Sequence, residues 1–171
     1  MSNLIRAGRC WKIGDDVASD ALISAHHTFE YDPKVLRKHL LHDLRPELAG
    51  LAQPGDTLLA GRRFGHGSHH SHPFLAMSDI GLGLLAQSLT RAPFRLAVFM
   101  AVPLLEIGRD VVDGIADGDH LHIDYGAGRI ENRTQGRVFN VAPLPDFLLE
   151  IVAAGGGLDY LRHFDHAIQS H

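Results

Sequence analysis

The stretch AGRRFGHGSHHSHPFLAMSDIG, residues 60–81, carries the pattern from which the fold is predicted. It begins at the end of a compact apolar run, DTLLAG (residues 56–61), which is typical of a buried strand. A glycine-rich segment follows, and HPFLAMSDIG (residues 72–81) then has the composition of a short helix. The stretch therefore predicts a strand, a glycine-rich turn and a helix in succession.

The same alternation continues toward the C-terminus. LGLLAQS (residues 82–88) predicts a buried strand, PFRLAVFMAV (residues 93–102) a helix, and PLLEI (residues 103–107) another strand. Strands that alternate with helices indicate an α/β core. In such folds ligands bind where a strand ends and a helix begins, and the histidine-rich segment around Ser68 lies at such a place.

The flanking segments complete the predicted organisation. On the N-terminal side, RAGRCWKIGDDV (residues 6–17) and DALISA (residues 20–25) each predict a short strand. DPKVLRKHLLHDL (residues 32–44) predicts a helix with Asp32 as its cap and Pro33 in its first turn, and residues 45–56 predict a loop or short helix.

On the C-terminal side, residues 118–144 predict a β meander because apolar and polar residues alternate around the turn GAG. PDFLLEIVAAGGGLDYLRHF (residues 145–164) predicts an amphipathic helix, a glycine-rich stop and a last short helix. The histidines of RHFDHAIQSH (residues 162–171) form no motif, and we expect a solvated terminus there.

Length and composition narrow the class of protein. With 171 residues and no repeats or long linker, the chain predicts one domain over residues 1–171, with its core at about residues 8–164. The formal net charge of −4 gives no sign of nucleic-acid or membrane-surface binding. No signal peptide and no apolar run of about 18 residues is present, so we expect no membrane span.

The cysteine content also excludes some functions. Cys10 is the single cysteine, so an intrachain disulfide framework is excluded and a reducing, cytoplasmic location is expected. One thiol cannot supply the usual four thiolates of an iron–sulfur cluster.

Four histidines surround Ser68, and three interpretations of them are open. His66, His69, His70 and His72 could hold a metal, could help to bind an anion at the helix start, or could be a solvated loop that happens to be rich in histidine. Consecutive His69 and His70 usually point apart, and no cysteine, HExxH motif or spaced carboxylate supports them, so we expect no metal site. Ser68 could present a hydroxyl to an anion or could simply cap the helix.

Four blocks of the sequence resemble a known family. They are residues 11–25, 55–72, 86–106 and 136–164, from WKIGDDVASDALISA to GRVFNVAPLPDFLLEIVAAGGGLDYLRHF. They follow one another as the motifs of 3-isopropylmalate dehydratase small subunits do, which are the swivel domains of the aconitase family. The resemblance covers nearly all of residues 8–164, and it implies an α/β fold of the swivelling β/β/α type.

The resemblance also implies a function. The family's hydro-lyase and isomerase reaction, in leucine biosynthesis, removes and re-adds water on a hydroxy di- or tricarboxylic acid. The family carries its [4Fe–4S] cluster and most acid–base residues on a separate large subunit, so this chain would need no cofactor of its own. It would close over the cluster as a lid on a small hydroxy-acid substrate.

The resemblance assigns roles to the loop residue by residue. The family loop reads Gly-Ser-Ser-Arg-Glu-His, often after Cys-Gly, whereas this chain has Gly67-Ser68-His69-His70-Ser71-His72 after His66. Ser68 matches the catalytic serine base, and His72 matches the family histidine. His70 replaces the arginine that binds a substrate carboxylate. Arginine is a permanent bidentate donor, whereas histidine is charged only near or below about pH 6.5.

Other positions both match and depart from the family. Arg91 and Arg95 match, and with the loop residues Gly67, His66, His69, His70 and His72 they are candidate substrate-binding residues. Leu96, Phe99 and Met100 fall where the family usually has asparagine or other polar residues. Core packing is the favoured interpretation of Phe99 and Met100, and a more apolar substrate pocket is the alternative.

The first block, SDALISAHHTFEYDP (residues 19–33), also differs from the family pattern. The family commonly has proline and a basic residue near Ser24 and His26, and HHTF replaces its aromatic–leucine pair. We hypothesise that His26 or His27 and His69 or His70 line one cleft, where they bind an unusual acid or tune a proton transfer.

Three functions are compatible with these residues. The first is a dehydratase or isomerase small subunit for a hydroxy acid other than 3-isopropylmalate. The second is an ordinary isopropylmalate isomerase subunit with tolerated changes. The third is a non-catalytic swivel domain that binds a small ligand or regulates a partner.

Overall fold

Strand β1 (Ile5–Gly14) joins the two halves of a seven-stranded sheet in the computed structural model, which describes the backbone of residues 4–169 and the side chains of residues 4–163. The strand order is β4-β3-β2-β1-β5-β6-β7. On one side of β1 lie the parallel strands β2 (Thr57–Ala60), β3 (Gly83–Ala86) and β4 (Leu104–Glu106). On the other side lie the antiparallel strands β5 (His120–Asp124), β6 (Arg129–Asn132) and β7 (Arg137–Asn140).

The parallel half forms the centre of the core. Leu58 pairs with Trp11 on one neighbouring strand and with Leu84 on the other, and Leu84 pairs with Leu104. Every residue of β2 and β3 is buried, as the unbroken apolar runs predicted. The α/β order predicted from residues 56–107 is therefore confirmed.

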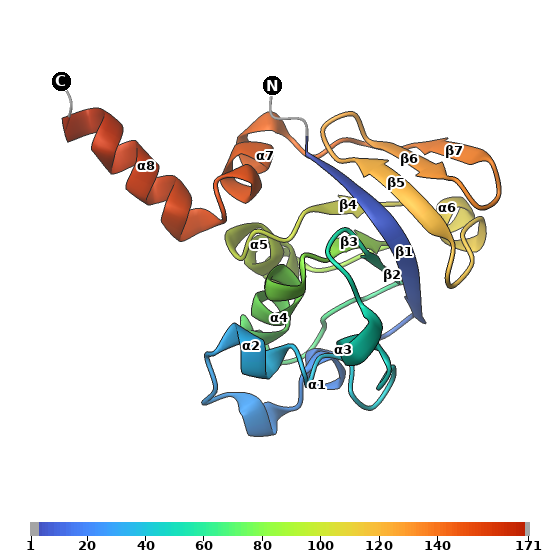
Figure 1. Ribbon diagram of the computed structural model, residues 1–171, viewed down its shortest axis with the longest axis horizontal. Coiled ribbons are helices and arrows are strands. Elements are labelled where there is room, and N and C mark those ends of the chain that lie inside the picture. The colour runs from blue at the N-terminus through green and yellow to red at the C-terminus, as the bar shows by residue number, and fades with distance from the viewer. Residues whose placement is uncertain (1–3, 170–171) are drawn as a thin grey trace.

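Helices α4 (His72–Ile80) and α5 (Arg91–Phe99) connect these parallel strands and lie side by side (Figure 1). Because the strands follow one another across the sheet in sequence order, right-handed crossovers place both helices on the same face. The antiparallel half curls toward the parallel half. Tyr125, which directly follows β5, reaches across to Gly83 of β3. Its hydroxyl lies so close to Gly83 that a Cβ atom at this position would be only 2.0 Å from it.

The connection from β1 to β2 departs from the predicted pattern. It contains α1 (Ser19–Leu22), the 3-10 helix η1 (Ala25–His27), α2 (Pro33–Leu36) and α3 (Leu48–Leu51). The predicted strand over residues 20–25 is wrong, because Ser19 and Leu22 are buried at a spacing of three residues, as in a helix.

Helix α2 begins as predicted but is shorter. The side chain of Asp32 accepts a hydrogen bond of 2.9 Å from the Lys34 N–H, which confirms the cap. The helix ends at Leu36 instead of continuing to Leu44. Beyond it, Leu41 has a φ of 54° and donates its N–H to the Leu22 carbonyl, so its backbone contacts α1 instead of extending a helix.

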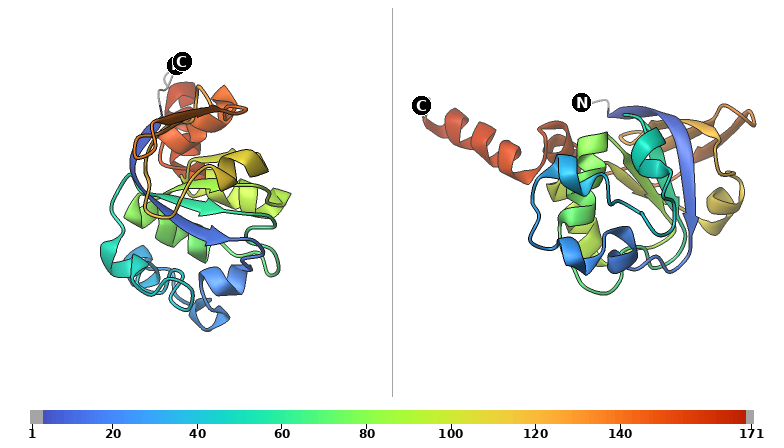
Figure 2. Two further views of the ribbon diagram at one scale, coloured as in Figure 1. Left: turned by 90° about the vertical axis from the view of Figure 1, so that its right-hand side faces the viewer. Right: turned by 60° about the horizontal axis from the view of Figure 1, so that its bottom comes forward.

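The C-terminal helices confirm the predicted glycine stop. Helix α7 (Asp146–Ala153) ends before the glycines, and α8 (Gly157–Gln169) begins within them. Helix α8 is longer than the predicted short helix and projects away from the sheet (Figures 1 and 2). The terminus predicted to be solvated lies partly outside the described residues. Helix α6 (Arg109–Asp113) follows β4 in the chain and lies beside the antiparallel strands (Figure 1). None of the helices within residues 4–169 combines the length and apolar character needed to span a bilayer.

One position stores backbone strain that a glycine would relieve. Ala101, directly after α5 and its C-cap Met100, has a φ of 62°, a conformation that costs an L-residue about 1 kcal/mol. We expect Ala101→Gly to raise the free energy of unfolding by roughly 0.5–1 kcal/mol, measured by urea denaturation. The comparison variant Ala92→Gly, in the first turn of α5, is expected to lower it by up to about 0.5 kcal/mol. A loss of stability in Ala101→Gly would contradict this account.

Candidate functional site

The histidine-rich loop lies between the loops that follow β1 and β3. Gly65 donates its N–H to the Val17 carbonyl at 2.8 Å, and Ser19 donates to the His66 carbonyl at 2.9 Å. On the other side, Phe64 donates to the Ser88 carbonyl at 3.0 Å. The loop therefore occupies the carboxyl edge of the parallel strands, where the α/β order predicted a ligand site.

Glycines give the loop its shape and present Ser68 at its tip. Gly65 has a φ of 69°, and a Cβ atom there would lie 3.3 Å from the Pro93 ring. Gly67 has a φ of 98°, a conformation that L-residues with side chains rarely adopt. Ser68 is exposed, and its side chain makes no hydrogen bond to any described residue.

The helix-cap interpretation of Ser68 is wrong. Helix α4 begins at His72, and the residue at its N-cap position is Ser71, which makes no side-chain cap bond. Pro73 then occupies the first turn. Ser68 lies several residues outside the helix, so its hydroxyl is left available.

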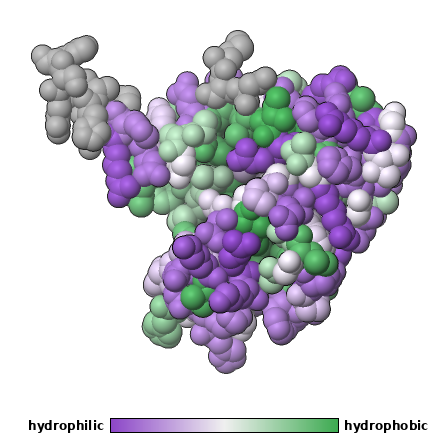
Figure 3. All heavy atoms as spheres, in the orientation of Figure 1, coloured by the Kyte–Doolittle hydropathy of each residue, from purple (hydrophilic) through white to green (hydrophobic). Residues whose placement is uncertain are grey.

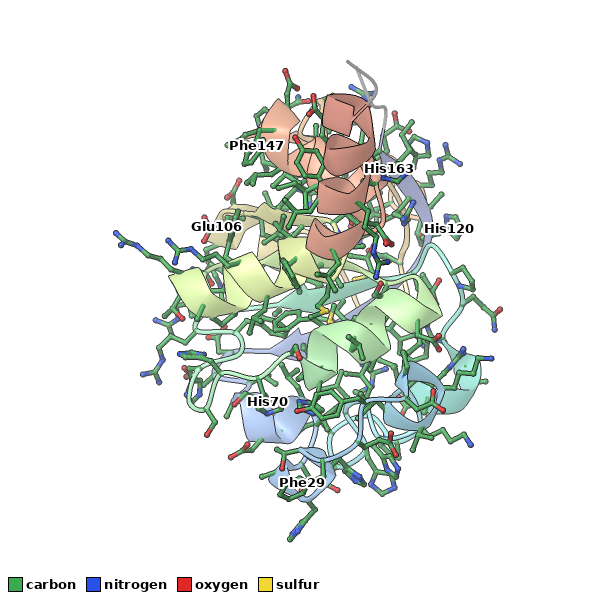
Figure 4. All side chains as sticks on the ribbon, turned by 90° about the vertical axis from the view of Figure 1, so that its left-hand side faces the viewer. Phe29, His70, Glu106, His120, Phe147 and His163 are labelled. Carbon is green, nitrogen blue, oxygen red and sulfur yellow. The ribbon has the colours of Figure 1, made fainter. Side chains whose placement is uncertain are left out.

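His70 and His72 form a contacting pair. Their Nδ1 atoms are 3.1 Å apart, and within the described part of the chain both Nε2 atoms are buried without a hydrogen-bond partner. The Asp20 carboxylate lies 4.0 Å from His70 Nε2, and the Tyr31 ring lies 4.9 Å from the His72 ring. Burial lowers the pKa of His70, the neighbouring His72 lowers it further, and Asp20 opposes both. Figure 4 shows His70 between α1 and the start of α4.

The other two loop histidines point elsewhere. His69 is exposed, and half-buried His66 places its Nε2 atom 3.2 Å from the Asp16 carbonyl. The four imidazoles therefore do not converge on one point. Within residues 4–163, no group of three or more His, Cys, Asp or Glu side chains has an arrangement that could hold a metal ion.

His27 lines a different cavity from the one predicted. Its ring stacks on His39 with centroids 3.8 Å apart, whereas neighbouring His26 is exposed. The cavity, of about 370 Å³, is lined by Asp20, Ala21, Ser24, His27, His39, His42 and Asp43. His69 and His70 are not among these residues. Asp20 connects the two places, because its carboxylate lines this cavity and also faces His70.

Known proteins similar to this chain identify its family. A small subunit of 3-isopropylmalate dehydratase from Archaeoglobus fulgidus is 39% identical over 156 residues, which are 91% of this chain and 96% of that protein. The corresponding protein of Methanosarcina mazei is 40% identical over 91% of this chain and 95% of its own length. The chain belongs to the family of 3-isopropylmalate dehydratase small subunits. No protein-family model matches the sequence.

A solved structure extends this assignment to the fold. The crystal structure of 3-isopropylmalate dehydratase from Methanocaldococcus jannaschii is 29% identical and superposes with a TM-score of 0.89 over 98% of both chains. The α/β fold of the swivelling β/β/α type, predicted through the resemblance to 3-isopropylmalate dehydratase small subunits, is therefore confirmed.

The family-matched arginines lie on α5, apart from the histidine pair. Arg91 and Arg95 are exposed and one helical turn apart. They line a cavity of about 170 Å³ together with Leu89, Thr90, Phe94 and Glu106. Leu89 forms an isolated bridge with Phe64 of the histidine loop. The backbone just before the arginines therefore contacts the histidine loop. The arginine side chains line a cavity that none of the loop histidines lines.

The core-packing interpretation of Phe99 is wrong. Phe99 is 41% exposed at the far end of α5, whereas Met100 and Leu96 are half-buried against the core. Phe99 and Met100 line a cavity of about 420 Å³ beside Leu158 of α8. In Figure 3, apolar surface gathers between the base of α8 and the rest of the molecule. These residues therefore do not make the site around Ser68 more apolar.

Several residues of the site were not predicted from the sequence. Asp20 and Tyr31 contact the histidine pair, and His39 stacks on His27. The Ser19 hydroxyl is buried near Gly67 without a partner in the described structure. Nothing in the spacing of these residues distinguishes them, because they meet only when the β1–β2 connection folds back onto α4.

Proposed function

We propose that the chain is the small subunit of a hydro-lyase that removes and re-adds water on a hydroxy di- or tricarboxylic acid, and that it acts with a separate large subunit. The observation that carries this proposal is 39% identity to a 3-isopropylmalate dehydratase small subunit over 96% of that relative's length. The exposed position of Ser68 at the carboxyl edge of the sheet supports it. The continuous sheet supports the further proposal that residues 1–171 work as one swivelling domain.

We assign the [4Fe–4S] cluster to the large subunit. Cys10 is the single cysteine of this chain and is completely buried in β1. Burial raises the pKa of its thiol to about 12, so it does not supply the thiolate that a cluster requires. On the large subunit the cluster would supply a Lewis acid toward the substrate. A reducing compartment such as the cytoplasm suits both the free thiol and such a partner.

Ser68 is the residue that we assign to proton transfer. In its deprotonated form, Oγ would take the proton that leaves the substrate carbon on dehydration and return it on rehydration. The turn at Gly67 holds this hydroxyl clear of the rest of the chain, on a surface that a partner can cover. Closure of the large subunit over this surface would exclude water from the reacting atoms.

The remaining candidate residues would hold the substrate around Ser68. We assign a carboxylate to His70 and His72, with Gly67, His66 and His69 around the turn. His27 would reach the substrate from the cavity beside Asp20, with exposed His26 next to it in the chain, and Arg91 and Arg95 would attract the anionic substrate from the α5 side. Because imidazoles occupy the place of a guanidinium, we propose a substrate other than 3-isopropylmalate.

Reconstitution tests this function. The chain is combined with the aconitase-type large subunit of its own cells under anaerobic conditions, and alkene formation from a panel of hydroxy acids is followed by ultraviolet absorbance. We expect turnover only when both chains are present, with 3-isopropylmalate slower than at least one other acid. The large subunit alone is the control. No turnover of any acid by the assembled complex would contradict the proposal.

A further inference from the structure

Exposed apolar side chains gather where α8 leaves the rest of the molecule. Leu158 and Leu161, on α8, are 59% and 57% exposed. Phe99, at the end of α5, and Phe147, on α7, are 41% and 60% exposed. Single exposed apolar residues are ordinary on a protein surface, whereas a group of them on neighbouring elements is typical of an interaction site.

Phe99 lines two cavities at this junction. The larger, of about 420 Å³, extends from Phe99 to Leu75 of α4 and Leu158 of α8. The smaller, of about 190 Å³, extends from Phe99 to Leu148 and Ile151 of α7. We call these two neighbouring cavities the α8 groove. Its apolar lining is typical of a surface that receives the apolar face of a helix.

Helix α8 has little of its own chain packed against it. Its start is fixed on Phe99, because a Cβ atom on Gly157 would lie 2.2 Å from the Phe99 ring, and the Tyr160 ring lies edge-on to Phe147 at 6.2 Å. Beyond this start the helix projects away from the sheet (Figures 1 and 2). A helix of 13 residues is only marginally stable in water unless its apolar face is packed. We therefore expect another surface to cover it.

We propose that a second copy of this chain covers this surface, and that the two copies exchange their α8 helices about a twofold axis. Each copy carries both an α8 groove and a projecting α8, so one copy can receive a helix and supply one in return. This is the self-complementary arrangement that a twofold dimer requires.

The area available matches that of a stable dimer. A helix of 13 residues is about 20 Å long and about 12 Å across, so half of its side surface is roughly 400 Å². A copy that buries this helix face and an equal area of groove buries roughly 800 Å² in all. Each partner in a stable interface of standard size buries about that area.

The charged residues of the larger cavity allow a helix to approach. Arg162 pairs with Asp159 at 2.8 Å within α8, and Asp79 of α4 pairs with Arg37 at 3.2 Å. Because these charges already have partners in their own chain, the dimer does not bury an uncompensated charge there.

The position of the α8 groove favours a second copy over the large subunit. The groove includes Ser78, in the last turn of α4, and Phe99, at the end of α5. Ser68 precedes the first turn of α4, at the carboxyl edge of the sheet. A large subunit that covers Ser68 would thus occupy the opposite end of these helices. The dimer concerns this chain alone and does not depend on the proposed function.

The first test measures the mass of the full chain alone by size-exclusion chromatography with light scattering. We expect the mass of two chains at micromolar concentration. The double variant Leu158→Glu, Leu161→Glu places two charges on the interface and should weaken dimerisation at least about a hundredfold. Leu51→Glu, on α3, is the matched control, because Leu51 is 56% exposed and far from α8, and it should stay dimeric.

The second test locates the interface by amide hydrogen exchange. We expect the amides of α8 to be protected in the wild-type dimer and to exchange at least about tenfold faster in the double variant. The amides of β2 and β3 should stay protected in both proteins, which shows that the variant is folded.

Three results would overturn the inference. They are a wild-type chain with the mass of a single copy, a double variant that dimerises as the wild type does, and α8 amides that exchange equally fast in both proteins. If the wild-type chain were monomeric and the double variant no longer bound the large subunit, the α8 groove would belong to the large subunit. Absence of turnover in the reconstituted complex would overturn the proposed function and leave the dimer standing.

Discussion

Ser68→Ala is expected to abolish turnover of the assembled enzyme, with kcat falling by at least about a thousandfold. The variant removes the hydroxyl that we assign as the base and leaves the Gly67 turn intact. Because Ser68 is exposed and makes no side-chain hydrogen bond within the described residues, its loss should not change the free energy of unfolding. Steady-state kinetics on the reconstituted complex measure the effect, and urea denaturation of the chain checks the stability.

Ser78→Ala is the matched control for this experiment. Ser78 lies in the last turn of α4, at the opposite end of this helix from the loop, and lines the cavity near α8. We expect it to retain kcat within about twofold. If Ser68→Ala kept kcat at the level of Ser78→Ala, Ser68 would not be the base, and the proton would have to go to a residue of the large subunit.

Asp56→Ala is expected to lower the free energy of unfolding by about 3–5 kcal/mol, because it leaves one buried and two partly buried N–H donors without their charged acceptor. Asp56 is 5% exposed and lies directly before β2. Its carboxylate accepts hydrogen bonds from the Arg9 N–H at 2.8 Å, the Trp11 indole at 2.9 Å and the Gln53 N–H at 3.0 Å. These bonds tie β1 to the turn before β2.

Two variants make the Asp56 experiment specific. Asp56→Asn keeps one acceptor oxygen and should destabilise less than alanine does, by about 1–3 kcal/mol. Asp43→Ala, whose side chain is 85% exposed, should change stability by no more than about 0.5 kcal/mol. Urea denaturation measures all three. A loss below about 1 kcal/mol in Asp56→Ala would show that these donors find other partners.

The parts of the fold that sequence patterns predicted are those that local periodicity determines. The buried runs of β2 and β3, the helices between the parallel strands and the meander of β5–β7 follow from apolar spacing and turn residues. The long β1–β2 connection could not be predicted in this way. Its helices have only three or four residues, which is too short for a repeating pattern of apolar residues to be recognised. Leu41 donates its backbone N–H to Leu22 of α1, a tertiary contact that sequence spacing does not indicate.

In the candidate site, too, the sequence predicted the features set by local order and motif, and it did not predict those set by tertiary contacts. The position of Ser68 at the end of a parallel strand followed from the order of elements, and its likeness to a catalytic serine followed from the motif. The pairing of His70 with His72, and the approach of Asp20 and Tyr31, depend on tertiary contacts between α1, the η1 loop and α4. For the same reason, the sequence did not indicate that His27 would meet His39.

The measurement that tests the central claim most directly is anaerobic co-purification of the tagged chain from its native cells, followed by an absorbance spectrum and mass analysis of the proteins recovered. The account predicts a brown complex in which this chain is bound to one aconitase-type large subunit that carries the iron–sulfur absorbance. A colourless preparation of this chain, recovered without such a partner, would contradict it.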